Sequence, residues 1–193
     1  AVLGATGAVG QEMLQILAER QFPIKSLKLL ASPRSAGRKV EFNNQEYVIE
    51  AVSADQFADV DIAFFAAGGD ASKQWAPVAI EAGCTVIDNS SAFRMNPDVP
   101  LIVPEVNMEA AKNHQGIIAN PNCSTIIFAL ALKPIYDAVG ISRVVVSTYQ
   151  AVSGAGQAAI DELTAQTQAY ASGEEIEAEV LPVKGLPKHY PIL

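Results

Sequence analysis

Cys123 is the residue with the clearest capacity for covalent chemistry. It stands in the segment Asn120-Pro-Asn-Cys-Ser-Thr125, directly before an apolar stretch with helical character. A helix N-terminus presents free backbone N–H groups and the positive end of the helix dipole, which favours a thiolate and stabilises a negative adduct. Asn120 and Asn122 can cap such a helix. The segment predicts a cysteine nucleophile, while a small buried hydrophobe, the usual role of a free cysteine, fits the residues equally well.

A glycine-rich turn, Gly4-Ala-Thr-Gly-Ala-Val-Gly10, follows the first apolar residues of the chain. Its spacing departs from the usual dinucleotide fingerprint, in which the first two glycines are two residues apart. Small residues nevertheless let the backbone approach a pyrophosphate at the N-terminus of the following helix. The turn therefore indicates nucleotide binding; the alternative is a tight turn without a ligand.

The loop after the second expected strand bears on the choice of nucleotide. About 20 residues beyond the glycine turn, an NAD site would offer Asp or Glu to the ribose hydroxyls. The chain instead reads Ala31-Ser-Pro-Arg-Ser-Ala-Gly-Arg-Lys39, with no acid and several cations. The cations favour binding of a 2′-phosphate and hence of NADP. The alternative is a solvated basic loop without a ligand.

Other polar residues are less decisive. Arg94 ends a segment that follows an expected strand, where open α/β sheets bind ligands, and it can bind a phosphate or carboxylate or remain an exposed arginine. Cys84 precedes an apolar run and is expected to be structural. The turn at residues 153–156 can close over a cofactor or only reverse the chain. The two histidines, His114 and His189, are not well placed as bases, and the chain shows no metal-ligand spacing.

Apolar runs separated by helical patterns predict a doubly wound, mostly parallel α/β sheet of the Rossmann type. A change of texture divides the chain into a nucleotide-binding domain at residues 1–121 and the incomplete start of an α+β catalytic and dimerisation domain at residues 122–193. The expected strands are residues 1–3, 26–31, 61–67, 84–88, 101–103, 116–119 and 143–150, with a hairpin at 38–52. The expected helices are residues 11–19, 71–82, 124–139 and 157–170, followed by an extended connection at 171–193.

Composition excludes several classes of function. Half of the 193 residues are hydrophobic, so a sizeable core is available. The net charge of −8 argues against nucleic acid or an anionic membrane as a partner and leaves small metabolites. We expect no membrane span and no signal peptide, and two free thiols fit a reducing cytoplasm. Both ends of the chain have the character of cuts within a longer protein.

Five blocks together resemble the bacterial aspartate-semialdehyde dehydrogenases, in the right order and over essentially the whole chain. The blocks are Gly4-Ala-Thr-Gly-Ala-Val-Gly10, Asn89-Ser-Ser-Ala-Phe-Arg94, Val103-Pro-Glu-Val-Asn107, Asn120-Pro-Asn-Cys-Ser-Thr125 and Thr148-Tyr-Gln-Ala-Val-Ser-Gly-Ala-Gly156. The resemblance strengthens the assignment of Cys123 as the nucleophile. It implies reversible reductive dephosphorylation of aspartyl phosphate to aspartate semialdehyde with NADPH, through a cysteine thioester.

The resemblance also implies a role for each matching residue. Catalysis falls to Cys123, with Gln150 beside the thioester, and substrate or phosphate binding falls to Arg94, Asn122 and Gln150. The residues that match the cofactor site are Thr6, Gly7, Ala8 and Val9 at the pyrophosphate, Arg34 and Ser35 at the 2′-phosphate, and Ser153 and Gly154 at the nicotinamide. The family works as a cytoplasmic homodimer or homotetramer in diaminopimelate, lysine, threonine and methionine biosynthesis.

Length is the departure from the family. Its members continue well beyond a segment such as residues 181–191, and the later part supplies a histidine acid/base and an arginine for the substrate carboxylate. We therefore expect residues 1–193 alone to be inactive. Two alternatives stay open: N-acetyl-glutamyl-phosphate reductase, in which a glycine usually precedes the thiol where this chain has Asn122, and a non-catalytic NADP-binding module.

Overall fold

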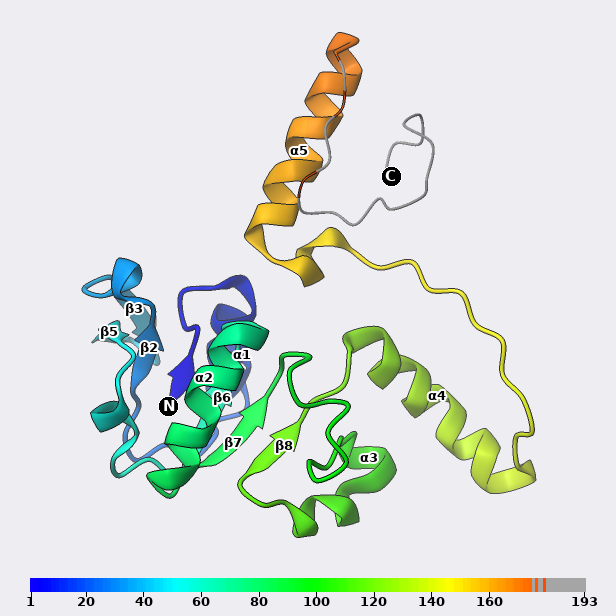
Figure 1. Ribbon diagram of the computed structural model, residues 1–193, viewed down its shortest axis with the longest axis horizontal. Helices are drawn as coiled ribbons and strands as arrows, with labels where there is room; N and C mark the ends of the chain where they lie inside the picture. The colour runs from blue at the N-terminus through cyan, green and yellow to red at the C-terminus, as the bar shows by residue number, and fades with distance from the viewer. Residues whose placement is uncertain (175, 177–178, 180–193) are drawn as a thin grey trace. The chain divides into compact units, whose positions relative to one another are not determined.

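The computed structural model describes residues 1–174, 176 and 179. The chain forms two compact units, Ala1–Val145, called here the first unit, and Val146–Leu193, the second unit. The first unit holds the sheet and most of the helices (Figure 1).

The first unit is built on a six-stranded sheet in the order β5-β2-β1-β6-β7-β8, and every pairing within it is parallel. The strands are β1 (Val2–Leu3), β2 (Leu29–Ala31), β5 (Glu50–Ala51), β6 (Ile62–Phe65), β7 (Thr85–Asp88) and β8 (Ile117–Ala119). This order is that of the doubly wound dinucleotide-binding sheet. The predicted Rossmann-type fold is therefore confirmed.

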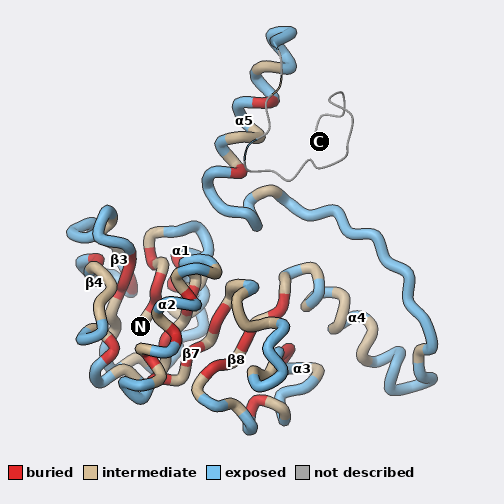
Figure 2. Tube along the Cα trace, viewed as in Figure 1, coloured by how far each residue is buried: buried red, intermediate tan, exposed pale blue. Residues whose placement is uncertain are grey.

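Two helices cover opposite faces of this sheet, because neighbouring residues of a strand point to opposite sides. Val2 and Leu29 pack with Leu14 of α1 (Ala8–Glu19), whereas Leu3 and Leu30 pack with Ala76 and Ala79 of α2 (Gly69–Glu81). The buried residues follow the strands between the helices (Figure 2). The strands thus lack polar alternation because both of their faces are buried.

A small antiparallel hairpin, β3 (Lys39–Phe42) and β4 (Gln45–Val48), leaves the main sheet after β2. Its turn is Asn43-Asn44, as predicted, and both residues have positive φ, 51° and 61°, which two-residue hairpin turns require. The predicted hairpin extends too far, since residues 50–51 form β5 and pair in parallel with β2.

Several predicted boundaries are wrong. Helix α1 begins at Ala8, three residues early, since Gly7 caps it, and β2 is shorter than the expected 26–31. The expected strand at 101–103 is reduced to one parallel bridge between Leu101 and Ala119, because Pro104 starts the short helix α3 (Pro104–Asn107). The remaining 3₁₀ turns of the first unit are η1 (Pro33–Ser35), η2 (Ala54–Phe57) and η3 (Met108–Asn113).

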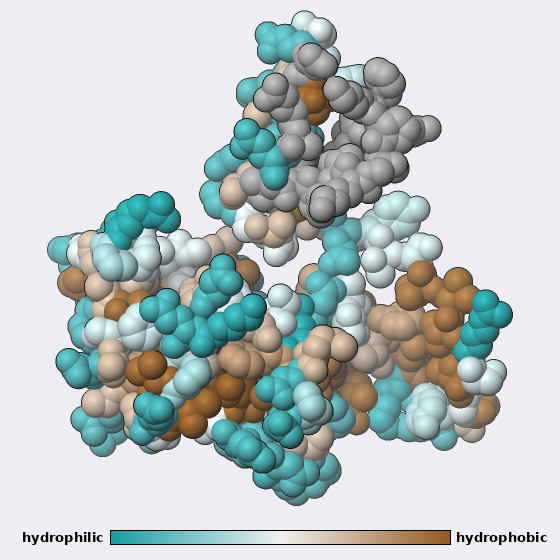
Figure 3. Space-filling model, viewed as in Figure 1, coloured by the Kyte–Doolittle hydropathy of each residue, from teal (hydrophilic) through white to brown (hydrophobic). Residues whose placement is uncertain are grey.

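Helix α4 (Cys123–Val139) confirms the helix expected from Ser124, yet none of its residues is buried. Large apolar side chains are exposed along it, and the surface over α4 is among the hydrophobic regions of Figure 3. These side chains are Ile127, Leu130, Ile135, Tyr136 and Val139. The helix therefore presents an apolar face that the described residues leave open.

The strand expected at residues 143–150 is wrong: these residues are not in a strand. Their side chains are exposed, Val145 by 80% and Tyr149 by 99%. Alternating and β-branched residues favour an extended conformation, but a strand also needs a hydrogen-bonded neighbour, and no strand of the described chain pairs with this segment.

The second unit contains the turn η4 (Val152–Ala155) and the helix α5 (Gln157–Ser172), which ends at Gly173 in the left-handed conformation. The helix predicted from residue 157 is confirmed and is two residues longer than expected. Most of the extended connection predicted at 171–193 lies outside the described residues.

Substitution of Gly10 should test the tight glycine turn. A Cβ at Gly10 would lie 2.2 Å from the carbonyl oxygen of Gly4, whereas one at Gly7 would lie 3.4 Å from the same oxygen. Gly10→Ala should therefore lower the free energy of unfolding by about 3 kcal/mol, and Gly7→Ala by less than about 1 kcal/mol. Urea unfolding of the complete protein measures both; equal losses would show that the contact is not the constraint.

Candidate active site

The loops that follow β1, β6, β7 and β8 lie side by side at one edge of the sheet, called here the carboxyl edge. Backbone hydrogen bonds connect them in sequence: Ala66 N–H donates to Leu3 O at 2.8 Å, Asn89 N–H to Phe65 O at 3.0 Å, and Asn120 N–H to Asp88 O at 2.8 Å. Open α/β sheets bind ligands at this edge. The glycine turn follows β1, Arg94 lies in the loop after β7, and Cys123 lies at the end of the loop after β8.

The glycine turn brings the N-terminus of α1 to the carboxyl edge. Gly4 has φ of 91°, and a Cβ on it would lie 2.7 Å from the carbonyl carbon of Ala66, so only glycine fits between β1 and the loop after β6. Gly7 caps α1 without a side-chain hydrogen bond, and residues 7–9 are exposed. Helix N–H groups without partners and a close backbone suit a phosphate or pyrophosphate.

The basic loop reaches the same edge. Arg34 and Ser35 lie in η1 directly after β2, and the N–H of Gly4 donates to Leu30 O of β2 at 2.8 Å. Arg34 is exposed and Ser35 is half-buried. The loop is therefore near the ribose end that a dinucleotide lying on the glycine turn would present.

Arg94 connects the ends of β7 and β8. Its Nε donates to Asn120 O at 2.9 Å and its Nη2 to Asn89 O at 3.0 Å, and the Nδ2 of Asn120 donates to the Oδ1 of Asn89 at 2.6 Å. These bonds use two of the five guanidinium N–H groups, so three remain for a ligand. The half-buried guanidinium is thus fixed by the backbone and can still bind an anion.

Cys123 is the first residue of α4 and is exposed. The side chain of Asn122 caps the helix, accepting a hydrogen bond from the N–H of Ser124 at 3.1 Å. Because Arg94 donates to the carbonyl of Asn120, three residues before the thiol, its guanidinium is attached to the segment that leads into α4. Cys123 is not a buried hydrophobe, which was the structural alternative.

Cys84, by contrast, is 3% exposed, and its thiol donates to Phe57 O at 3.4 Å. Burial raises the pKa of this thiol above its ordinary value. The two cysteines therefore differ as the sequence predicts, one buried in the core and one exposed at a helix N-terminus.

The remaining predicted residues belong to the second unit. Gln150 is exposed, and its Nε2 donates to the Oγ1 of Thr148 at 3.4 Å. Ser153 and Gly154 are exposed within η4. Thr6 to Val9, Arg34, Ser35, Arg94, Asn122 and Cys123 lie in the first unit, whereas Gln150, Ser153 and Gly154 belong to the second unit.

Sequence reasoning missed the buried carboxylate of Asp88 at the end of β7. It is 0% exposed and accepts hydrogen bonds from Ser72 of α2 and from Ser90. The signal was available, since an acid that ends an otherwise apolar strand must find buried donors. The pairing of Asn89 with Asn120 was also missed, because the two are 31 residues apart in sequence.

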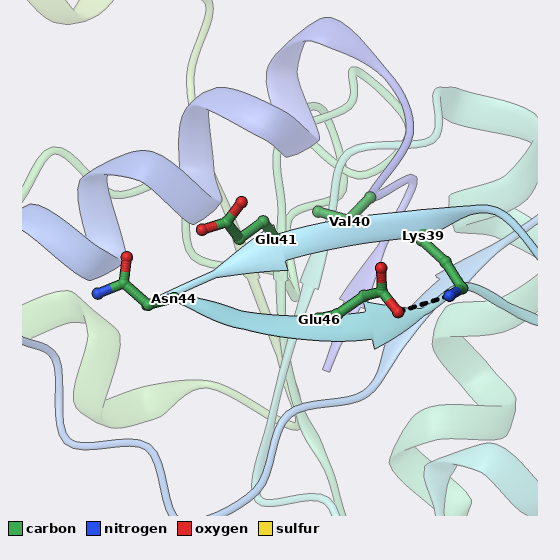
Figure 4. A pocket seen from close by; sticks show the side chains of 5 residues that line it. All are labelled: Lys39, Val40, Glu41, Asn44 and Glu46. Carbon is green, nitrogen blue, oxygen red and sulfur yellow. Dashed lines mark ion pairs between the residues drawn. The ribbon is translucent and has the colours of Figure 1, made fainter.

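Two surface hollows are lined by residues other than those of the candidate site. One, of about 470 Å³, is lined by the β3–β4 hairpin, where Lys39 and Glu46 form an ion pair at 2.6 Å (Figure 4). Both side chains of this pair are mostly exposed, so the pair contributes little. The other hollow, of about 580 Å³, is lined by Ala1, Lys28 and Asp61 among others, at the amino ends of the strands. Neither contains the predicted site residues.

Two further kinds of feature are absent from the part of the chain that the structure describes. No cluster of three or more His, Cys, Asp or Glu side chains there could hold a metal ion. No helix among the same residues has the length and apolar character to cross a membrane.

Two family models match the sequence of the chain. The NAD binding domain of semialdehyde dehydrogenase matches residues 1–114, more than half of the chain, and the dimerisation domain of semialdehyde dehydrogenase matches residues 132–185. This chain belongs to the semialdehyde dehydrogenase family. The expected family is thereby confirmed, together with a Rossmann domain that precedes the start of a dimerisation domain.

Relatives of this semialdehyde dehydrogenase chain carry a more specific name. Aspartate-semialdehyde dehydrogenase of Bacillus subtilis is 56% identical over 192 residues, which are 100% of this chain and 56% of that protein. The Synechocystis protein of the same name is 53% identical over 182 residues, 94% of this chain and 54% of that protein. The chain thus spans about half the length of these relatives.

Solved structures show the same likeness. Aspartate semialdehyde dehydrogenase II from Vibrio cholerae has a TM-score of 0.85 and 53% identity, over 94% of this chain and 55% of that chain. The same Vibrio protein complexed with ASA gives a TM-score of 0.86 at 52% identity, over 94% and 55%. The Candida albicans enzyme with NADP has a TM-score of 0.61 and 29% identity, over 73% of this chain and 47% of that chain.

The contrast between the two thiols predicts selective alkylation. In the complete protein at neutral pH, iodoacetamide should label Cys123 at least about tenfold faster than Cys84, because Cys84 is buried and its raised pKa lowers the thiolate fraction. Raising the pH should narrow the difference. Peptide mass mapping measures both rates, and unfolding in guanidinium should make them equal. Equal rates in the native protein would contradict this contrast.

Proposed function

We propose that the complete protein containing these residues is an NADP-dependent aspartate-semialdehyde dehydrogenase. It converts L-aspartyl phosphate reversibly to L-aspartate semialdehyde. The observation that carries the proposal is the hydrogen bond from Arg94 to the carbonyl of Asn120, three residues before Cys123, in a chain more than 50% identical to enzymes of that name. A guanidinium fixed on the segment that leads to a thiol suits acyl transfer to and from phosphate.

The residues present fit a dinucleotide. The exposed N-terminus of α1 and the close packing at Gly4 and Gly10 leave space for a pyrophosphate that side chains would fill. Thr6 to Val9 hold that pyrophosphate, and Arg34 and Ser35 hold the 2′-phosphate. When bound, the cofactor accepts a hydride in the oxidative direction.

In that direction the thiolate of Cys123 attacks the aldehyde carbon, and a carbon–sulfur bond forms as the carbonyl oxygen takes up a proton. Loss of a hydride to NADP and of the hydroxyl proton to a base turns the hemithioacetal into a thioester. A phosphate oxygen, held by Arg94, then attacks the acyl carbon. The carbon–sulfur bond breaks, acyl phosphate leaves, and the thiolate is restored. The base corresponds to the histidine expected in the later part of the family sequence.

The other assigned residues complete the site. We assign Gln150 and Asn122 to contacts with the substrate beside the thioester, and Ser153 and Gly154 to the nicotinamide. The functional boundary follows Pro121, so that residues 1–121 bind NADP and residues 122–193 begin the catalytic and dimerisation domain. The enzyme is a cytoplasmic homodimer or homotetramer that serves lysine, threonine and methionine biosynthesis through the diaminopimelate route.

Residues 1–193 alone are proposed to be inactive. The apolar face of α4 and the exposed segment at 143–150 are surfaces that a folded enzyme covers. The chain matches a dimerisation domain, and its relatives are longer than the chain. We therefore assign the covering of these surfaces to the later part of the family sequence.

The nucleophile is tested by Cys123→Ser in the complete protein. Phosphate-dependent oxidation of aspartate semialdehyde should fall by at least about 10³-fold, because a neutral serine hydroxyl is a far weaker nucleophile than a thiolate. The affinity for NADP should change less than about twofold, as measured by fluorescence titration. Cys84→Ala is the matched control and should keep activity.

Residual turnover close to that of the unmodified enzyme would remove Cys123 from the mechanism. A wild-type complete protein that binds NADP but oxidises no aspartate semialdehyde would instead support the non-catalytic module. Turnover by residues 1–193 alone would refute the proposed need for the remaining sequence.

Cofactor preference is tested by Arg34→Ala. Loss of a charge-assisted hydrogen bond to the 2′-phosphate should raise the Kd for NADP by about tenfold to a hundredfold, while the Kd for NAD changes less than about twofold. Arg20→Ala removes an exposed arginine from the opposite end of α1 and is the control for net charge. An equal weakening of both cofactors, or of neither, would contradict a 2′-phosphate contact.

A further inference from the structure

Asp88 is a fully buried carboxylate that the proposed chemistry does not use. Its Oδ1 accepts from the Oγ of Ser72 at 2.6 Å and from the N–H of Ser90 at 3.1 Å, and its Oδ2 accepts from the Oγ of Ser90 at 2.8 Å. Burying a carboxylate costs several kcal/mol unless hydrogen bonds offset the loss of hydration. Asp88 lies at the end of β7, directly before the loop that carries Arg94. A buried carboxylate at this place can therefore affect the candidate site.

The hydroxyl of Ser90 links Asp88 to the loop that follows through two hydrogen bonds. It donates its one proton to Asp88 Oδ2 and accepts from the N–H of Ala92 at 3.0 Å. The loop between β7 and Arg94 is therefore held from inside at residues 90 and 92. Its far end is held by the guanidinium of Arg94 on the carbonyls of Asn89 and Asn120.

We propose that Asp88, acting through Ser90, is a positioning residue for phosphate: it fixes the loop that sets the guanidinium of Arg94 against the Cys123 turn. The inference rests on the proposed function, in which Arg94 binds the phosphate that attacks the thioester. The three hydrogen bonds to this carboxylate reach two different elements. The two bonds from Ser90 reach the Arg94 loop, whereas the bond from Ser72 reaches α2.

This separation supplies a matched pair of variants in the complete enzyme. Ser90→Ala and Ser72→Ala each remove one serine hydroxyl that donates to Asp88, but only Ser90→Ala also removes the acceptor for the N–H of Ala92 and so loosens the Arg94 loop. Ser90→Ala should raise the KM for inorganic phosphate about tenfold, with kcat at saturating phosphate changed less than about threefold. Ser72→Ala should lower the thermal midpoint but keep the KM for phosphate within about twofold. Ser90→Thr keeps the hydroxyl and should restore the KM.

A second measurement does not need turnover. Inorganic phosphate bound at Arg94 should protect Cys123 from iodoacetamide, and the half-protecting concentration should rise about tenfold in Ser90→Ala but not in Ser72→Ala. If Ser90→Ala matches either the wild type or Ser72→Ala in KM and in protection, the positioning role is overturned while the proposed function stands. If the wild type has no phosphate-dependent activity, the proposed function fails, and the protection of Cys123 by phosphate alone decides the positioning role of Asp88. If phosphate does not protect Cys123 in the wild type, that positioning role is overturned.

Discussion

Parallel pairing of β1, β6, β7 and β8 is the constraint on which the rest of the first unit depends. Parallel strands end at the same edge, so residues far apart in sequence meet there without any further device. The hydrogen bonds that join Leu3 to Ala66, Phe65 to Asn89, and Asp88 to Asn120 continue this alignment one residue into the loops. The glycine turn, the guanidinium of Arg94 and the thiol of Cys123 are thereby brought to the same end of the sheet.

Packing at that edge leaves little freedom. Gly4 contacts the backbone after β6, and Gly10 contacts Gly4, so close backbone contacts fix the turn and the start of α1 in addition to the packing of Leu14 in the core. At the other end of the edge, Arg94 binds two carbonyls that end neighbouring strands. The site is thus fixed by main-chain geometry on one side and by a charged side chain on the other.

Sequence patterns predicted the parts of this arrangement that depend on local chemistry. The glycine turn, the Asn43-Asn44 hairpin turn and the helix that starts near Cys123 follow from residues within one short segment. Features that join distant segments were not predictable in the same way. The bond between Asn89 and Asn120 depends on the strand order, and residues 143–150 have strand-like composition without a strand to pair with in the described chain.

The backbone bonds of Arg94 have a thermodynamic consequence for any anion that binds it. A free arginine side chain loses rotamer entropy when a ligand orders it, at a cost of about 0.5–1.5 kcal/mol per immobilised side chain. Here Nε and Nη2 are already bonded to Asn120 and Asn89, so that ordering accompanies folding of the chain. An anion that binds there can then be taken up and released without ordering and disordering the guanidinium again.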